Sequence, residues 1–184
     1  MQRSYCWKRE TEGSHCYAEQ KIDAMHITYI SNEDALCLEI IQDKIKFFAM
    51  SMYIDIEEQI ENIFTKIDQI LQFVKGQRIL IDTDSNSRSK TWHAEIRNTR
   101  GKIGGIHASR HLHIINEQSE TVTFHNRGGS SKIDLTIANK RIADVHECEI
   151  SELEIFSDHN FPKFKVGKHN SYENKYQCIR YMIK

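Results

Sequence analysis

The sequence lacks the features that would place the chain in a membrane or in an oxidising compartment. No apolar run is long enough to span a bilayer, and the N-terminus is too polar and charged for a signal peptide. The five cysteines form no C-x-x-C pair, and their odd number favours the reduced thiols of an intracellular protein. With one proline and eight glycines, the 184 residues show no linker and are predicted to form one domain.

A strong overall charge and the commonest catalytic motifs are also absent. The 25 basic and 26 acidic residues give a formal net charge of -1, so only a local basic patch would predict a polyanionic partner. No G-x-S-x-G, P-loop or G-x-G-x-x-G motif is present. The chemistry that these motifs mark is therefore not predicted.

The stretch over residues 78–93 organises the rest of the chain. Residues 79–81 form a short apolar run that is typical of a buried strand. The run ends in Asp82, Asp84 and Asn86 among several serines, so the strand is predicted to end at Asp82 or Asp84. Polar side chains at such a tip suggest a site, and an ordinary strand exit is the alternative.

Three strands and a helix are predicted ahead of this stretch. Their patterns predict strands over residues 26–30, 35–41 and 46–53, and a polar turn makes the last two a hairpin. Apolar residues at steps of three and four then predict a helix. Asp55 is its predicted N-cap, in a capping-box pattern, and Gly76 its predicted left-handed end.

A cationic segment follows the organising stretch. Between residues 86 and 113 the sequence has a single acidic residue, Glu95. The basic residues in the same range are Arg88, Lys90, Arg97, Arg100, Lys102 and Arg110. Basic residues directly after a polar strand tip suit contacts with a phosphate backbone. The alternative is a solvated helix face.

Acidic and histidine side chains recur at predicted strands in the second half of the chain. Asp134 lies between apolar neighbours in a strand predicted over residues 130–138. A carboxylate is costly to bury there unless a cation, a histidine or a metal binds it. Asp158 and His159 directly precede the strand predicted over residues 161–166.

Together, Asp84, Asn86, Asp134, Asp158 and His159 have the residue types that phosphodiester hydrolysis needs. A histidine held by a carboxylate can move a proton near neutral pH. An amide can bind the charge that develops on the phosphate, and a further carboxylate can hold a divalent cation. The sequence therefore predicts a phosphodiesterase-type site.

The order of these motifs resembles the endonuclease/exonuclease/phosphatase superfamily. Asp84-Ser85-Asn86, followed by Trp92-His93, looks like its Asp-x-Asn motif. The closer resemblance is to the apurinic-endonuclease-like domain of arthropod non-LTR retrotransposons, and it covers about residues 20–166. The later motifs that match lie at residues 98–102, 112–116, 123–124, 130–137 and 157–159.

The resemblance implies a fold, an activity and partners. The expected fold is a DNase I-like α/β (α+β) four-layered sandwich, with two mostly antiparallel β-sheets packed face to face and helices outside. The expected activity is nicking of DNA with Mg²⁺ or Mn²⁺. The resemblance also implies a nuclear location and an ancestral fusion to a reverse transcriptase.

The resemblance assigns a role to each matching position. His159 would act at the scissile phosphate with Asp134 orienting it, and Asp84 would position or activate the attacking water. Asn86 would bind the phosphate, and the remaining site residues are Tyr53 and the metal-binding Asp158. The residues expected to contact DNA are Arg88, Lys90, Arg97, Arg100, Lys102, Ser130 and Ser131, and Asn116 matches a motif position near the site.

The resemblance also exposes a departure. The family has an earlier strand bearing an Asn and a further strand bearing the metal-binding Glu, whereas Glu10 and Glu12 lie in a polar segment without a strand pattern. We therefore expect an irregular segment over residues 1–22, a partial domain over 23–166 without its first strands, and a polar tail over 167–184. Loss of those strands would weaken or abolish the activity.

Three alternatives stay open at this level. The first is a non-catalytic DNA-binding remnant that uses the basic segment 88–110 and binds in a salt-sensitive way. The second is a small-molecule or lipid phosphatase of the same superfamily, against which the run over residues 130–136 argues. The third is a fragment that folds poorly, because missing strands weaken a sheet. The oligomeric state does not follow from the sequence.

Overall fold

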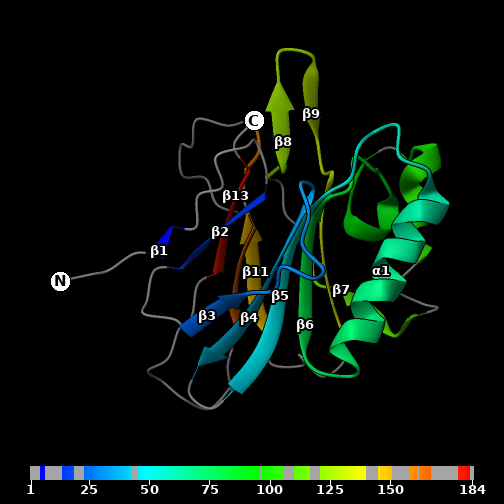
Figure 1. Ribbon diagram of the computed structural model, residues 1–184. Coiled ribbons are helices and arrows are strands. Elements are labelled where there is room, and N and C mark those ends of the chain that lie inside the picture. The colour runs from blue at the N-terminus through cyan, green and yellow to red at the C-terminus, as the bar shows by residue number, and fades with distance from the viewer. Residues whose placement is uncertain are drawn as a thin grey trace.

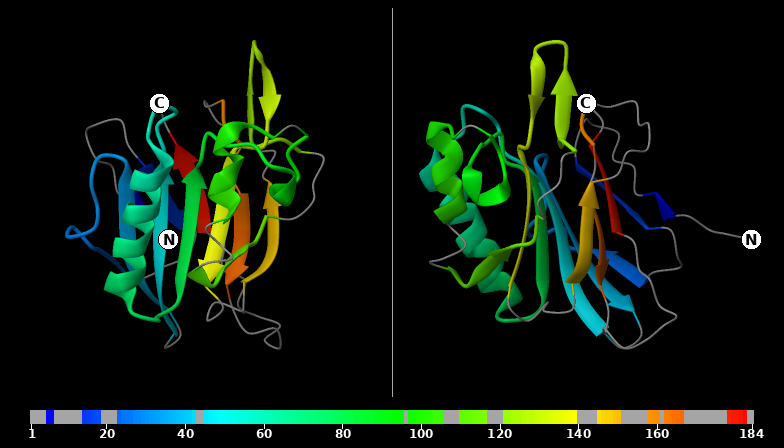
Figure 2. Two further views of the ribbon diagram at one scale, coloured as in Figure 1. Left: turned by 90° about the vertical axis from the view of Figure 1, so that its right-hand side faces the viewer. Right: turned by 180° about the vertical axis from the view of Figure 1, so that it is seen from behind.

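The described residues form two large β-sheets that face each other and a separate two-stranded hairpin, with helix α1 (Ile60–Val74) outside one of the large sheets (Figures 1 and 2). The computed structural model describes residues 5–6, 14–18, 23–42, 45–95, 97–105, 110–116, 121–139, 145–150, 158–160, 162–166 and 178–182. Within this part of the chain, no helix has the length and hydropathy needed to cross a membrane. The predicted sandwich of facing sheets with helical segments outside is confirmed.

The larger sheet carries the site. Its strands, in spatial order, are β3 (Asp23–His26), β4 (Ala35–Gln42), β5 (Ile45–Tyr53), β6 (Ile79–Asp84), β10 (Asp134–Asn139) and β7 (Leu112–Ile114). The β5–β6 pair is parallel because α1 carries the chain back between them, and the other neighbours are antiparallel. The hairpin predicted from β4 to β5 and the strand that ends at Asp84 are both confirmed.

The second sheet uses both ends of the chain. Its strands, in spatial order, are β1 (Tyr5–Cys6), β2 (Ser14–Ala18), β13 (Cys178–Met182), β12 (Pro162–Val166) and β11 (Val145–Ile150). Strands β1, β2 and β13 fall in segments for which the sequence predicts no regular structure. Residues 14–18 pair with residues 178–182, which lie far away in the sequence. Such non-local pairing leaves a weaker local signature than a helix does.

The two faces of the larger sheet have different surroundings. Ile79 and Ile81 pack with the buried side of α1, whereas Leu80 packs on the opposite face with Ala49 and Ala138. Because side chains alternate along a strand, Asp82 and Asp84 share the face of Leu80. All six residues of β6 are buried, so both carboxylates are inside the sandwich.

The helix starts later than the sequence predicts. Its N-cap is Gln59, which makes no side-chain cap, whereas the Asp55 carboxylate accepts a hydrogen bond from the Glu57 N–H at 2.7 Å. Asp55 therefore closes a turn before the helix, a use of Asp that competes with helix capping. The predicted left-handed end is confirmed, since Lys75 and Gly76 have φ values of 37° and 70°.

Two predicted strands also have different limits. The strand predicted over residues 26–30 lies earlier, as β3, and a turn follows it. The strand predicted over residues 130–138 is divided into β9 (Gly129–Ser131) and β10. The break occurs where Thr123 Oγ1 accepts the N–H groups of Ile133 and Asp134. β9 instead pairs with β8 (Phe124–Asn126) in a hairpin that rises above the sheets (Figure 1).

Candidate active site

The ends of three strands bring the predicted site residues into one row. Strands β5 and β6 finish side by side at the edge where β10 begins. The register pairs Tyr53 with Asp84, and Asp84 with Asp134. Side chains from three distant parts of the sequence are therefore neighbours on one face of the sheet. The β8–β9 hairpin rises beside this edge (Figure 1).

His159 has a carboxylate beside each ring nitrogen. Its Nδ1 lies 3.1 Å from Asp134 Oδ2, and its Nε2 lies 3.7 Å from Asp84 Oδ2. Asp84, Asp134 and His159 are only 1%, 3% and 6% exposed, so both carboxylates stabilise positive charge on the ring in a dry setting. The first contact has hydrogen-bond length, whereas the second leaves a gap that a water or a substrate oxygen can bridge.

The base of the β8–β9 hairpin positions the His159 ring. The Phe124 ring meets the imidazole edge-on, with centroids 4.9 Å apart and planes at 60°. The backbone N–H of His125 donates to the Asp158 carbonyl oxygen at 2.8 Å. The segment that carries Asp158 and His159 is thus bonded to the hairpin beside the sheet edge. The sequence gives no separate signal for the part that Phe124 plays.

Two polar side chains hold the backbone of Asp134, and one of them, Asn116, lies at a motif position that the sequence already placed near the site. Thr123 Oγ1 accepts the N–H of Asp134 at 3.1 Å. Asn116 donates to the Asp134 carbonyl oxygen at 3.1 Å and accepts the Thr136 N–H at 2.7 Å. Asn116 and Thr123 belong to motifs that the resemblance matched, but their function as backbone supports is visible only in three dimensions.

Asn86 ties the tip of β6 to the chain that leaves β5. It has φ of 47°, a left-handed conformation that Asn tolerates better than most residues. Its backbone N–H donates to Asp84 Oδ1 at 3.2 Å, and its side-chain Nδ2 donates to the Ile54 carbonyl oxygen at 3.0 Å. The Asn86 amide also lies near the hydroxyl of Tyr53, whose pKa it lowers. Asp84, Asn86 and Tyr53 therefore form one connected group.

The Tyr53 hydroxyl is expected to stay protonated beyond the ordinary tyrosine range. Burial raises its pKa above 10.0, nearby carboxylates raise it further, and the Asn86 hydrogen bond lowers it. The stability that this tyrosine contributes should therefore be complete below about pH 10 and be lost as pH rises through the folded pKa. The ultraviolet phenolate titration of wild type minus Tyr53→Phe should show a group that ionises late, and an ordinary midpoint would contradict this assignment.

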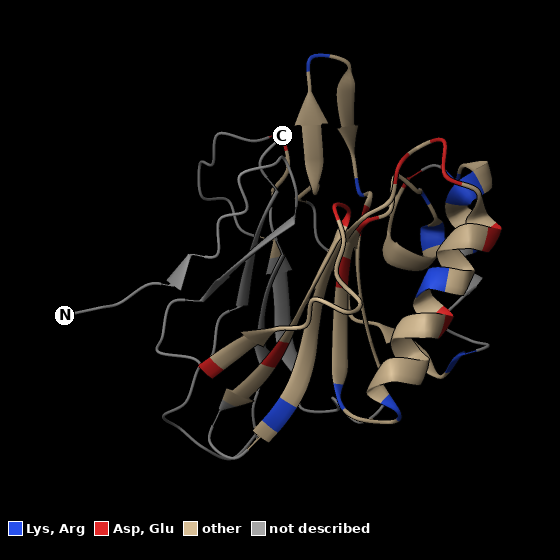
Figure 3. Ribbon diagram, in the orientation of Figure 1, with Lys and Arg blue, Asp and Glu red and all other residues tan. Residues whose placement is uncertain are grey.

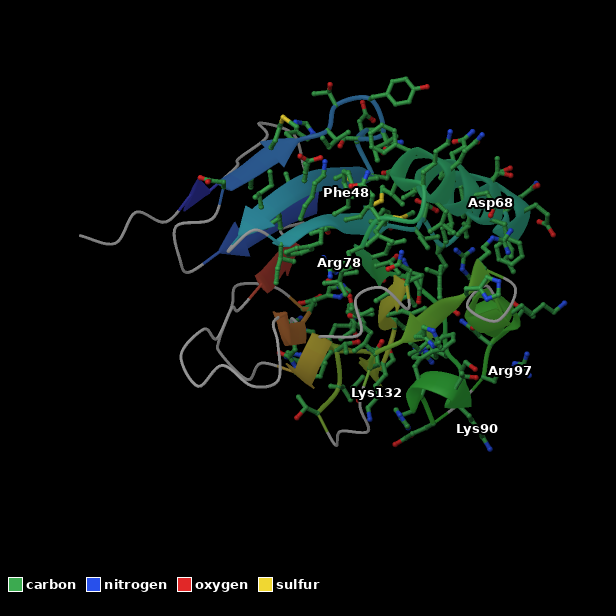
Figure 4. The ribbon with its side chains drawn as sticks, turned by 90° about the horizontal axis from the view of Figure 1, so that it is seen from below. Phe48, Asp68, Arg78, Lys90, Arg97 and Lys132 are labelled. Atoms are coloured by element: carbon green, nitrogen blue, oxygen red, sulfur yellow. The ribbon has the colours of Figure 1, made fainter. Side chains whose placement is uncertain are left out.

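The residues predicted to contact DNA fall into exposed and buried groups. The exposed ones are Lys90, Arg97, Lys102 and Ser130, whereas Arg88 is partly buried and Ser131 is buried in the hairpin. Lys90 begins the short 3-10 helical segment η1 (Lys90–Trp92), and Arg97 lies between η1 and η2 (Thr99–Gly105); Figure 4 shows both side chains at the outside of the molecule. The Arg100 guanidinium instead donates to the carbonyl oxygens of Asp55, Ile56 and Glu58. Their contact with DNA stays a prediction.

Among the described residues, Asp158 is the candidate ligand for a divalent cation at this edge. Asp158 is exposed and adjacent to His159. Across the described ranges, no three His, Cys, Asp or Glu side chains form a group that could hold a metal ion. Mg²⁺ is often bound by one or two carboxylates together with waters and substrate phosphates. Asp158 thus fits an open site that water and substrate complete.

Comparisons with known proteins identify the family and the fold. The model of the endonuclease-reverse transcriptase family matches residues 47–162. Among solved structures, the endonuclease domain of TRAS1, a telomere-specific non-LTR retrotransposon, has a TM-score of 0.76 at 20% identity, over 91% of this chain and 81% of its own. A search of the curated proteins finds no match.

More distant structures share the fold. An endonuclease/exonuclease/phosphatase family protein from Leptotrichia buccalis has a TM-score of 0.55 at 14% identity, over 80% of this chain and 61% of its own. A mannosyl-6-phosphatase from Bacteroides thetaiotaomicron has a TM-score of 0.53 at 12% identity, over 80% of this chain and 66% of its own. The family model covers more than half of the sequence, and the chain belongs to the endonuclease-reverse transcriptase family, a retrotransposon branch of the endonuclease/exonuclease/phosphatase superfamily.

Proposed function

We propose that the protein hydrolyses phosphodiester bonds in DNA and makes single-strand nicks in the presence of Mg²⁺ or Mn²⁺. The observation that carries this proposal is the buried imidazole of His159 between Asp134 at 3.1 Å and Asp84 at 3.7 Å. Family membership supports phosphodiester hydrolysis as the general chemistry.

The two carboxylates have different tasks in this proposal. Asp134 binds Nδ1 of His159 and thereby sets the ring orientation and tautomer. Nε2 is then directed at the scissile phosphate, where it donates a hydrogen bond to a phosphate oxygen. Asp84, on the other side of the gap, orients the attacking water and accepts its proton. General acid–base groups of this kind typically contribute about 10²- to 10⁴-fold to the rate.

Tyr53 and Asn86 supply neutral donors to the phosphate. The Asn86 amide is already held by the Ile54 carbonyl oxygen at 3.0 Å, so it needs little reorganisation when DNA binds. A raised pKa keeps the Tyr53 hydroxyl in its donating form. A divalent cation would be held by Asp158 with water and phosphate oxygens, and it would neutralise charge on the phosphate.

DNA is proposed to lie across the exposed cations beside this edge. Lys90, Arg97 and Lys102 are exposed, and so is Arg127 at the tip of the β8–β9 hairpin. Figure 3 shows basic residues both at this tip and on the short helical segments beyond the sheet edge. Contacts with several phosphates make binding strongly salt-dependent. We propose that nicking serves an associated reverse transcriptase in the nucleus.

The nicking rate is expected to be low. Asp158 is the single carboxylate assigned to the cation, and the described residues offer no three-ligand group. Loss of one preorganised electrostatic contact typically costs about 10²- to 10³-fold. The proposed domain is therefore a weakened enzyme.

Conversion of supercoiled plasmid to open circles tests the proposal. We expect slow nicking that requires Mg²⁺ or Mn²⁺ and stops with a chelator. Titration calorimetry should detect Mg²⁺ binding, and Asp158→Ala should weaken it by at least about tenfold. If the folded protein neither binds Mg²⁺ nor nicks plasmid with either metal, the enzymatic proposal is wrong. A panel of phosphomonoesters separates nicking from phosphatase activity.

A second candidate function is DNA binding without cleavage. The exposed side chains of Lys90, Arg97 and Lys102 favour it, because they need no metal to bind phosphate. Fluorescence anisotropy with labelled duplex DNA should then give an affinity that falls steeply with salt while the plasmid stays intact. Affinity that ignores ionic strength would exclude this candidate.

A further inference from the structure

We propose that Arg100 and Asn98 are positioning residues that clamp together the two backbone segments bearing Tyr53, Asp84 and Asn86. This inference rests on the proposed function for the meaning of those three side chains. It gives Arg100 a different task from the phosphate contact that its place in a basic segment predicts. The clamp joins residues 53–58, residues 84–88 and the start of η2.

Arg100 holds the segment that follows Tyr53. Its Nη1 donates to the carbonyl oxygens of Ile56 and Glu58 at 2.9 and 2.7 Å, and its Nη2 donates to that of Asp55 at 2.9 Å. A planar guanidinium can serve several acceptors at once, which the point charge of Lys cannot do with the same geometry. A guanidinium bound to three carbonyls is poorly placed to meet a phosphate.

Asn98 holds the segment that carries Asn86. Its Oδ1 accepts the Arg88 N–H at 2.9 Å, and its backbone N–H donates to the Arg88 carbonyl oxygen at 3.1 Å. Its Nδ2 approaches the Asn86 carbonyl oxygen at 3.4 Å. The backbone at residue 101 approaches the Arg88 carbonyl oxygen so closely that only a glycine fits there. A Cβ at Gly101 would lie 2.5 Å from that oxygen.

The two clamped segments are also bonded to each other. Ile54 donates its N–H to the Asp84 carbonyl oxygen at 3.0 Å and accepts Asn86 Nδ2 at 3.0 Å. Movement of residues 54–58 would therefore move Asn86, and also Tyr53, which directly precedes Ile54 in the chain. The start of η2 thus acts on the candidate active site although neither Arg100 nor Asn98 belongs to it.

The test compares Arg100→Ala, Arg100→Lys and Asn98→Asp with Arg97→Ala, which removes an exposed arginine of the same segment. Asn98→Asp keeps the acceptor for Arg88 but cannot donate to Asn86. Hydrogen exchange should become about tenfold faster over residues 54–58 in Arg100→Ala and less so in Arg100→Lys. It should become faster over residues 84–88 in Asn98→Asp, and stay unchanged in both segments in Arg97→Ala.

DNA binding and nicking give the second readout. Arg97→Ala should lower the slope of log affinity against log salt by about one, as loss of a phosphate contact does. Arg100→Ala should leave that slope unchanged, while the single-turnover nicking rate at saturating protein falls about 10²-fold through misalignment. A lower slope together with unchanged hydrogen exchange in Arg100→Ala would overturn the clamp.

The outcomes separate this inference from the proposed function. If the wild-type protein does not nick DNA, hydrogen exchange and the salt slope still decide whether Arg100 is a clamp. If Arg100→Ala does not fold, the milder Arg100→Lys and Asn98→Asp variants carry the test. Unchanged exchange in both of them, with folding confirmed by circular dichroism, would refute the inference.

Discussion

His159→Ala is expected to reduce the single-turnover nicking rate by about 10²- to 10⁴-fold, the typical contribution of a positioned acid–base group. The substitution removes the imidazole that lies between Asp134 and Asp84 at this edge. DNA affinity should change little, because the exposed cations remain in place. The rate is measured with plasmid DNA at saturating protein and fixed Mg²⁺.

Asp134→Asn provides a second test of this prediction, and His113→Ala is its matched control. Asp134→Asn keeps the size of the side chain but replaces a carboxylate with an amide beside Nδ1, so a comparable loss of rate is expected. His113→Ala removes an exposed histidine on β7 and should leave the rate within about twofold, as surface changes usually do. If His159→Ala retains the wild-type rate, the site assignment is wrong.

Trp92→Ala is expected to destabilise the fold by about 3–5 kcal/mol, the usual cost of truncating a large buried aromatic side chain. Trp92 is 1% exposed and packs in the core cluster between the larger sheet and α1. Its indole Nε1 donates to the Lys132 carbonyl oxygen at 3.2 Å, just before β10. Urea unfolding followed by circular dichroism measures the change in the free energy of unfolding.

Trp92→Phe separates packing from the hydrogen bond. It keeps most of the apolar volume and leaves the Lys132 carbonyl oxygen without its indole partner, so a loss of about 1–3 kcal/mol is expected. A loss below about 1 kcal/mol for Trp92→Ala would show that the ring does not support the core. Trp92 is the last residue of η1, so this prediction also tests whether η1 is anchored to the core.

Local patterns predicted the centre of the site. The apolar run before Asp84 is a buried strand, and Asp134 does start a neighbouring strand with its carboxylate inside. Both predictions depend on contiguous residues, whose alternation and burial are visible in one dimension. The residues alone left a cation, a histidine or a metal as the partner of Asp134, and it was the family resemblance that implied its contact with His159.

Capping signals and charge were less informative. The capping signal at Asp55 predicts a helix start, but the Asp55 carboxylate closes an earlier turn. Arg100 lies in a basic run, yet its guanidinium faces backbone carbonyls. A short acceptor or a long cation has several local partners of similar energy, and the rest of the fold decides among them.

The sequence by itself determined the ordered set of Asp84, Asn86, Asp134, Asp158 and His159, together with the strands that carry the first and third of these residues. Such features depend on residue type and short-range periodicity. Only the tertiary structure decided which nitrogen of His159 meets which carboxylate, that the two ends of the chain share a sheet, and that Arg100 binds the segment after Tyr53. These contacts join residues far apart in sequence, and their geometry is set by packing rather than by any local preference.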